Sequence, residues 1–232
     1  MTAMVWTEDK LKNASDTLEG KGAEDAVRWA LENFCPDLAL ACSFGAEDVA
    51  LVDMLAKINP TVKIFYLDTD LLFKETYEIR DKLIKKYGIA PIRHSPALTL
   101  QEQAKIYGDK LWAVNPDLCC KIRKIDPLIA ALKDLKCWIT GIRREQAATR
   151  ANARVVEWDN KFSLVKVNPL VKWTKKDVWN YIYKNDVPYN VLHDKGYLSI
   201  GCEPCTRPVK PGEDERSGRW TGFQKTECGL HK

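Results

Sequence analysis

The sequence of 232 residues lacks any apolar run long enough to cross a bilayer, and its first residues lack the apolar core of a signal peptide. It contains no internal repeat and no low-complexity tract. With 36 Lys and Arg against 32 Asp and Glu, the net charge of +4 is too small to indicate a polyanionic partner. We therefore expect a cytoplasmic globular chain that binds neither membranes nor nucleic acids. Its length is sufficient for one domain, residues 1–232, with a full-sized core.

Short apolar segments alternate with amphipathic segments along most of the chain. This alternation predicts an α/β fold with a mostly parallel sheet, helices on both faces, and ligands at the carboxyl ends of the strands. An N-terminal helical segment, 1–36, precedes the α/β core, 37–187. Residues 188–232 lose the periodicity, which predicts an irregular, ligand-organised segment that ends in a mobile tail. Strands are expected at 38–42, 62–67, 92–94, 137–142 and 162–167, and helices at 8–19, 23–34, 74–87, 100–107 and 119–132.

A turn between the first core strand and the next helix is a candidate anion site. Backbone N–H groups and the positive end of the helix favour an anion there. The turn lacks the second glycine and the Lys-Ser/Thr pair of a Walker loop. An ordinary strand–helix turn explains the pattern about as well, so the motif needs support from the rest of the chain. Its residues are Ser43, Phe44, Gly45, Ala46, Glu47 and Asp48.

The eight cysteines give the strongest chemical signal in the sequence. A reducing cytoplasm disfavours a disulfide framework, so clustered cysteines indicate a metal site or catalysis. The tandem pair Cys119-Cys120 and the pair Cys202-x-x-Cys205 can together hold zinc or a 4Fe–4S cluster. Neighbouring residues of a regular helix do not share a face, so a ligating tandem pair requires distorted geometry at the start of its helix. The alternative is a buried cysteine pair beside an unrelated reducible C-x-x-C.

Cys228 lies near the end of the sequence and is the candidate nucleophile. Lys225 and His231 favour its thiolate, which is the reactive form, whereas Glu227 opposes ionisation. The alternative is an exposed thiol on a tail, without a role.

Arginines gather after a predicted strand and again near the tail. Guanidinium groups suit sulfate and phosphate, because their fork of N–H donors matches these anions. A solvated basic face is the simpler interpretation, but the positions beside cysteines and strand ends favour a bound small anion. The basic residues are Lys121, Arg123 and Lys124 after the tandem cysteines, Arg143, Arg144, Arg150 and Arg154 after a strand, and Arg207, Arg216 and Arg219 near the tail.

Together these motifs resemble one family, the phosphoadenylylsulfate (PAPS) reductases. Within it, the chain is similar to the iron–sulfur branch of bacterial assimilatory adenylylsulfate (APS) reductases. The match extends from the first core strand to the tail, and it implies the adenine nucleotide alpha hydrolase-like form of the α/β fold. The matching stretches are the turn 43–48, Leu67-Asp68-Thr69, Cys119-Cys120, the stretch from Gly141 to Gln146, Cys202-x-x-Cys205, and the stretch from Lys225 to His231.

The resemblance implies thioredoxin-dependent reduction of APS to sulfite and AMP, in sulfate assimilation and cysteine biosynthesis. Cys228 would form a thiosulfonate, and thioredoxin or a similar dithiol would release sulfite from it. The resemblance assigns a 4Fe–4S cluster, which does not accept the reaction's electrons, to Cys119, Cys120, Cys202 and Cys205. The substrate-binding residues that it implies are the turn 43–48, Asp68, Thr69, Lys124, Arg143, Arg144, Arg150, Arg216, Arg219 and His231.

Three alternatives stay open at this point. A PAPS or dual APS/PAPS reductase differs in the 3′-phosphate of its substrate. An ATP-dependent tRNA thiolase shares the nucleotide-binding group, but Phe44 and Glu47 depart from the phosphate loop of its nucleotide-hydrolysing members. A zinc-stabilised binding module, with Cys228 as a redox switch, is the non-enzyme alternative. The identity of the electron donor and the choice between monomer and homo-oligomer are also open.

Overall fold

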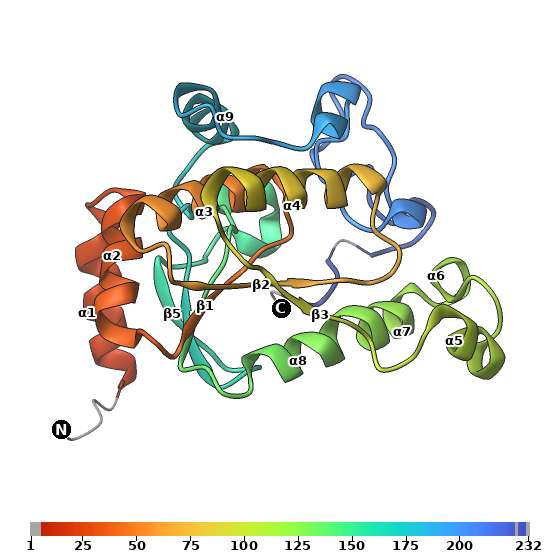
Figure 1. Cartoon of the computed structure of the whole chain (residues 1–232), viewed down its shortest axis with the longest axis horizontal. Coiled ribbons are helices and arrows are strands. Elements are labelled where there is room, and N and C mark those ends of the chain that lie inside the picture. The colour runs from red at the N-terminus through yellow and green to blue at the C-terminus, as the bar shows by residue number, and fades with distance from the viewer. Residues whose placement is uncertain (1–5, 226, 231–232) are drawn as a thin grey trace.

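A mostly parallel sheet forms the centre of the molecule in the computed structural model, which describes residues 6–225 and 227–230 (Figure 1). Within these residues six strands pair in the order β3-β2-β1-β4-β6-β5, and only β5 runs antiparallel to its neighbour. The predicted α/β fold with a mostly parallel sheet is therefore confirmed. The strands are β1 (Leu38–Ala41), β2 (Lys63–Leu67), β3 (Ile92–His94), β4 (Cys137–Ile139), β5 (Val156–Asp159) and β6 (Leu164–Val167).

Helices cover both faces of the sheet, as predicted. Figure 1 shows α3 and α4 on one side of the strands and α8 on the other. On the α8 side, Leu128 and Leu132 pack against Phe65 and Trp138 of the strands. In the described residues no helix is both long and apolar enough to cross a membrane. The α-helices are α1 (Glu8–Glu19), α2 (Ala23–Phe34), α3 (Ala46–Ile58), α4 (Lys74–Tyr87), α5 (Leu100–Tyr107), α6 (Leu111–Val114), α7 (Pro116–Cys120), α8 (Asp126–Leu132) and α9 (Lys175–Lys184).

The sequence pattern does not predict β5, which it assigns to a polar loop. β5 is an edge strand that pairs with β6 alone, from Val156 opposite Val167 to Asp159 opposite Leu164. Trp158 is exposed, and the strand is a four-residue segment without an apolar run that would distinguish it from a loop. Its place in the sheet depends on the backbone hydrogen bonds to β6, which only the folded chain supplies.

A helix distortion lies directly after the tandem cysteines, rather than at the start of their helix where the sequence predicts it. α7 ends at Cys120, and the backbone continues directly into a π-helix, Lys121–Ile125, before α8 begins. The N–H of Lys121 is shared between the carbonyl groups of Asp117 and Leu118. Cys119 and Cys120 themselves lie in α7, and the wider π-helical turn begins with the next residue. Such π-helical turns are frequent at functional sites.

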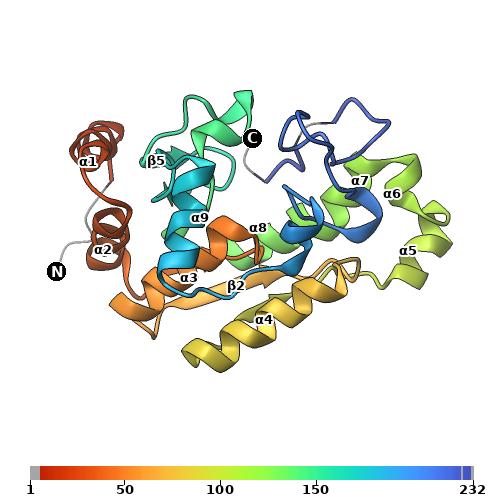
Figure 2. The ribbon, with the colours of Figure 1, turned by 90° about the horizontal axis from the view of Figure 1, so that it is seen from above.

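The C-terminal segment is irregular, as predicted, and is tied to the loop after β2. Two short 3₁₀ helices, Val191–Lys195 and Glu203–Cys205, are its described helical elements. The N–H of Glu203 donates to the carbonyl of Leu71 at 2.7 Å. Figure 2 shows the segment beside α7, where Lys225 forms an ion pair with Asp117. The end of the described chain is also docked, because Glu227 is only 2% exposed.

Candidate active site

A cleft opens where β1, β2 and β4 end, at the edge of the sheet where the fold predicts ligands. It has about 1340 Å³ of space outside the atoms, part of it open to solvent. One wall is the turn after β1, another is the loop after β4, and the C-terminal segment closes the third side. The chemically important side chains that line it are Ser43, Glu47, Asp48, Lys124, Gln146, Arg150, His193, Glu215, Arg216, Arg219 and Cys228.

The turn 43–48 presents the N-terminus of α3 to this cleft. Its shape is fixed from within, because the backbone N–H and the hydroxyl of Ser43 both donate to Asp48 Oδ2 at 2.6 Å. Phe44 has a left-handed φ of 62°, and its buried ring packs on Tyr66 with 5.3 Å between ring centres. Gly141 must be a glycine, since a Cβ there would lie 2.2 Å from Asp48 Oδ1. Burial raises the pKa of Asp48 to about 6, although the hydrogen bonds from Ser43 oppose this.

Arg219, which lines the cleft, is held on an aromatic platform that it shares with Lys225. The guanidinium of Arg219 lies 4.4 Å from the ring centre of Trp220, and the Lys225 ammonium lies 5.4 Å from it. Arg219 also packs directly on Gly201, where a Cβ would lie 2.1 Å from Nη2. Trp220 itself is 3% exposed. The platform therefore fixes Arg219 in one position at the cleft.

Cys228 lies in the same cleft and is half-buried. Burial raises the pKa of its thiol, but the charge of Lys124, a backbone hydrogen bond from Leu230 and the charge of Arg219 together bring the pKa below its ordinary value. The thiolate is therefore favoured at the position where an anionic ligand would bind. The sequence analysis expected this effect from Lys225 and His231, whereas the cations with a described influence are Lys124 and Arg219. His231 lies outside the described residues.

Four cysteines surround a second, smaller pocket next to the cleft, and they come from the two pairs that the sequence singled out. Lys124 and Arg219 line both pockets, so they lie between the cysteines and the cleft. Burial and the other three thiols raise the pKa of Cys119 to about 12. In the described residues, no three His, Cys, Asp or Glu side chains gather tightly enough to hold one metal ion. The four cysteines are Cys119, Cys120, Cys202 and Cys205.

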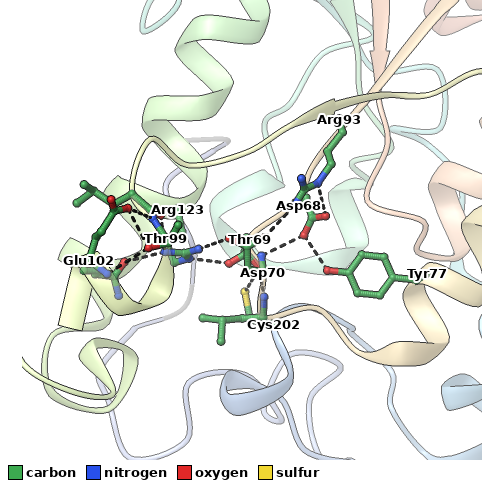
Figure 3. Close-up of polar contacts among 12 residues, drawn as sticks. Asp68, Thr69, Asp70, Tyr77, Arg93, Thr99, Glu102, Arg123 and Cys202 are labelled. Atoms are coloured by element: carbon green, nitrogen blue, oxygen red, sulfur yellow. Dashed lines mark hydrogen bonds and ion pairs between the residues drawn. The ribbon is translucent and has the colours of Figure 1, made fainter. Parts of the chain in front are cut away.

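The π-helix is fastened to the end of β2 by Arg123, which is 1% exposed (Figure 3). Arg123 donates to the carbonyl of Thr69 at 2.6 Å, to Asp70 Oδ2 at 2.6 Å and to Gln103 Oε1 at 3.1 Å. The Thr69 hydroxyl lies 3.3 Å from Cys202 Sγ. The end of β2 therefore joins the helix that carries the tandem cysteines to the loop that carries Cys202.

Four of the predicted substrate residues that the structure describes do not line the cleft: Asp68, Thr69, Arg143 and Arg144. Asp68 accepts hydrogen bonds from Tyr77 at 2.7 Å and from Arg93 at 2.6 Å, and so acts in the scaffold beside Thr69 (Figure 3).

The other two form ion pairs that connect distant segments. Arg143 is fully buried and pairs with Glu47 at 2.8 Å and with Glu215 at 3.2 Å, which connects α3 to the C-terminal segment. Arg144 pairs with Glu19 at the end of α1.

Three residues at the site were not singled out from the sequence as site residues. His193 lines the cleft, with Nδ1 2.8 Å from the carbonyl oxygen of Tyr197. Gln146 lines it too and accepts a hydrogen bond from Arg150. Glu227 is buried against the arginines rather than free beside Cys228. The sequence gives a signal for Gln146 and Glu227, which lie in the matching stretches 141–146 and 225–231, but none for His193.

Comparisons with known proteins agree on one family. The family model of the phosphoadenosine phosphosulfate reductase domain matches residues 37–208. A protein of Geobacillus sp. (strain WCH70) named adenosine 5′-phosphosulfate reductase is 47% identical over 232 residues, which cover 100% of this chain and 99% of that protein. One of the same name from Bacillus cereus (strain 03BB102) is 48% identical with the same coverage.

Two solved structures are also similar to this chain, one of them from the same family. A crystal structure of a phosphoadenylyl-sulfate (PAPS) reductase from Candida auris, a phosphate complex, matches with a TM-score of 0.79 and 31% identity. The match covers 89% of this chain and 100% of that one. An FMN adenylyltransferase from Candida glabrata matches with a TM-score of 0.59 and 12% identity, over 97% of this chain and 78% of that one. The second likeness is one of fold alone.

Proposed function

The chain belongs to the phosphoadenosine phosphosulfate reductase family, and from this premise we propose that it reduces adenosine 5′-phosphosulfate (APS) to sulfite and AMP in sulfate assimilation. The family predicted from the motifs is thereby confirmed, and the tRNA thiolase and the zinc-stabilised module are set aside. The observation that carries the proposal is the position of Cys228. Its thiol shares one cleft with Lys124, Arg216 and Arg219, at the edge of the sheet where a nucleotide would bind.

In the first step the Cys228 thiolate attacks the sulfur of the sulfate group. A sulfur–sulfur bond forms, the bond from that sulfur to the bridging oxygen breaks, and AMP leaves with the electron pair. Two anions must approach each other for this reaction, so cations are needed around them. Lys124, Arg216 and Arg219 supply that charge, and the lowered pKa of Cys228 favours the ionised nucleophile.

The turn 43–48 is the proposed site for the nucleotide's anionic end. The N-terminus of α3 faces the cleft, and its free N–H groups suit an anion. The carboxylate of Asp48 is already held by Ser43, so it shapes the turn. Asp68 and Thr69 have scaffold contacts that position the surrounding loops, and Arg143 and Arg144 likewise act through other residues.

The second step needs a dithiol donor, for which thioredoxin or a similar protein is proposed. One donor thiolate attacks Cys228 Sγ and displaces sulfite, which leaves with the electron pair of the sulfur–sulfur bond. The second donor thiol then resolves the mixed disulfide, so that the donor is oxidised and Cys228 is a free thiol again. Such a donor works in a reducing compartment, and a cytoplasmic location is part of the proposal.

A 4Fe–4S cluster is the proposed group for the four-cysteine pocket. Four buried or half-buried thiols around one small pocket fit the donor set of such a cluster, whose ligands stand further apart than those of a single ion. Cys119, Cys120, Cys202 and Cys205 would hold it. When bound, the cluster supplies a rigid charged junction between the π-helix and the C-terminal segment. The Thr69 hydroxyl contacts the sulfur of Cys202 from outside the pocket and would help to orient this ligand.

A side-by-side assay of sulfite formation from APS and PAPS, with thioredoxin as donor, tests this function. We expect turnover of APS, and we expect Cys228→Ser to abolish it while the variant still binds AMP. Turnover by Cys228→Ser, or no sulfite from either nucleotide, would contradict the proposal. Faster turnover of PAPS is the outcome for the second candidate, which is motivated by the Candida auris relative and its name.

A further inference from the structure

The tail that carries Cys228 has one buried polar anchor, Glu227, besides the Lys225–Asp117 ion pair and a hydrogen bond from Lys161 to the Gly229 carbonyl. Among the described residues of 221–230, Glu227 alone is buried, at 2% exposure, whereas the preceding residues 221–224 are exposed. Cys228, the next residue, is only half-buried. The anchoring contact therefore lies directly beside the proposed nucleophile.

The contacts of Glu227 are those of an anion-binding site. Arg150 donates from Nε to Oε1 and from Nη2 to Oε2, both at 2.9 Å, so the pair is bidentate. Arg216 Nη2 donates to Oε2 at 3.1 Å, and the hydroxyl of Thr149 lies 3.3 Å from Oε1. Burial raises the pKa of Glu227, but the hydrogen bonds and charge of Arg150 and the charge of Arg216 bring it below its ordinary value. The carboxylate is thus ionised in a nearly dry site.

The receptor for this carboxylate is braced by contacts within the loop after β4. Arg150 is 8% exposed and also donates to Gln146, whose side-chain oxygen accepts from the backbone N–H of Arg143 at 3.0 Å. Both Arg150 and Gln146 therefore belong to one braced loop after β4. A buried carboxylate is stable only when it is paired, and a buried guanidinium likewise requires an anion. Each partner consequently depends on the other.

We propose that Glu227 is a positioning residue that holds the tail on Arg150, so that Cys228 stays in the cleft for the attack on sulfur. Arg150, which the sequence analysis assigned to the substrate, then serves the tail. The other polar contacts of the tail, Lys225 with Asp117 and Lys161 with the Gly229 carbonyl, involve exposed partners and are weak, so release of Glu227 from its arginines can expose Cys228 to the dithiol donor. This inference rests on the proposed function for the chemistry of Cys228, but the docking itself does not.

Hydrogen exchange of the tail tests the docking without any reaction. Glu227→Gln keeps the size of the side chain and removes its charge, and we expect backbone amides of the C-terminal peptide 221–232 to exchange at least tenfold faster than in the wild type. Arg150→Met removes the other partner of the ion pair and should have the same effect. Agreement between the two variants shows that the faster exchange comes from loss of the pair rather than from a local defect of one variant. Glu213→Gln is the matched control, because this glutamate contacts Arg207, Lys210 and Ser217 outside the cleft. Unchanged exchange in both test variants would overturn the proposal, whatever the activity of the enzyme.

Single-turnover formation of the Cys228 adduct, measured with saturating APS and no reductant, tests the consequence for chemistry. We expect Glu227→Gln to slow adduct formation at least tenfold, with less than a threefold change in the affinity for AMP. If Arg150 acts through Glu227, the double variant Glu227→Gln/Arg150→Met is no slower than either single variant. Multiplied effects would mean that Arg150 acts on the nucleotide directly and would refute its assignment to the tail. A wild type that forms no adduct while its tail is protected from exchange would count against the proposed function and leave the docking supported.

Discussion

The fastening of the π-helix to the end of β2 makes a sharp stability prediction. Arg123→Met removes a guanidinium that is 1% exposed and leaves the carbonyl of Thr69, the side chain of Gln103 and one oxygen of Asp70 without their donor. Deleting one partner of a buried, hydrogen-bonded charge costs about 3–5 kcal/mol. Because Asp70 is one-third exposed, water partly compensates on that side, and we expect the lower end, about 3 kcal/mol. For a chain of this size, that corresponds to a decrease in Tm of about 6–12 °C.

The neighbouring arginine provides the matched control. Arg93 donates to Asp70 Oδ1 at 2.8 Å and to Asp68 at 2.6 Å, but its side chain is 51% exposed (Figure 3). Asp68 is only 5% exposed, but it keeps the Tyr77 hydroxyl and the Asp70 N–H as donors, and the Arg93 side chain itself reaches solvent, so Arg93→Met should decrease the Tm less than Arg123→Met does. Thermal unfolding followed by circular dichroism, on protein purified without oxygen, measures both. Equal Tm values for wild type and Arg123→Met, or a larger decrease for Arg93→Met, would refute this account of the scaffold.

Three further predictions concern the cleft and the cysteine pocket. Lys124→Gln should raise the pKa of Cys228, so its alkylation by iodoacetamide would reach half its maximal rate at a higher pH than in the wild type; an unchanged midpoint contradicts the role of Lys124. Gly201→Ala should displace the Arg219 guanidinium, since the new Cβ would lie 2.1 Å from it, and raise the KM for APS about tenfold or more with little change in circular dichroism. A wild-type KM would mean that Arg219 does not bind substrate. Protein purified without oxygen should be brown with about four irons per chain, and a colourless zinc protein would exclude the cluster.

The regular elements could be predicted from the sequence because their signals are local. The predicted range 100–107 coincides with α5, whose N-cap Thr99 and Glu102 form a capping box. The predicted range 74–87 coincides with α4, which ends at Gly88 in the left-handed conformation. The adjacency of Cys119 and Cys120, which predicts a distorted helix, is also a local signal, and a π-helix follows these residues.

The partners of the charged residues could not be predicted, because they come from distant segments. Arg144 follows a strand, where a substrate residue is expected, yet its partner Glu19 lies 125 residues away. Glu227 and Arg150 are separated by 77 residues. A sequence pattern places a residue at the end of a strand, but it does not show which way the side chain points. The docked tail is therefore a finding of the folded structure, and the expected mobility remains a prediction.

The measurement that tests the central claim most directly is a stoichiometry without reductant. Enzyme mixed with excess APS should release about one AMP per active chain and then stop, because Cys228 is consumed as the thiosulfonate. Mass spectrometry should locate one sulfonate on the peptide that contains Cys228, and adding a dithiol should release it as sulfite. An adduct on another cysteine, or continued release of AMP without a reductant, would contradict the account.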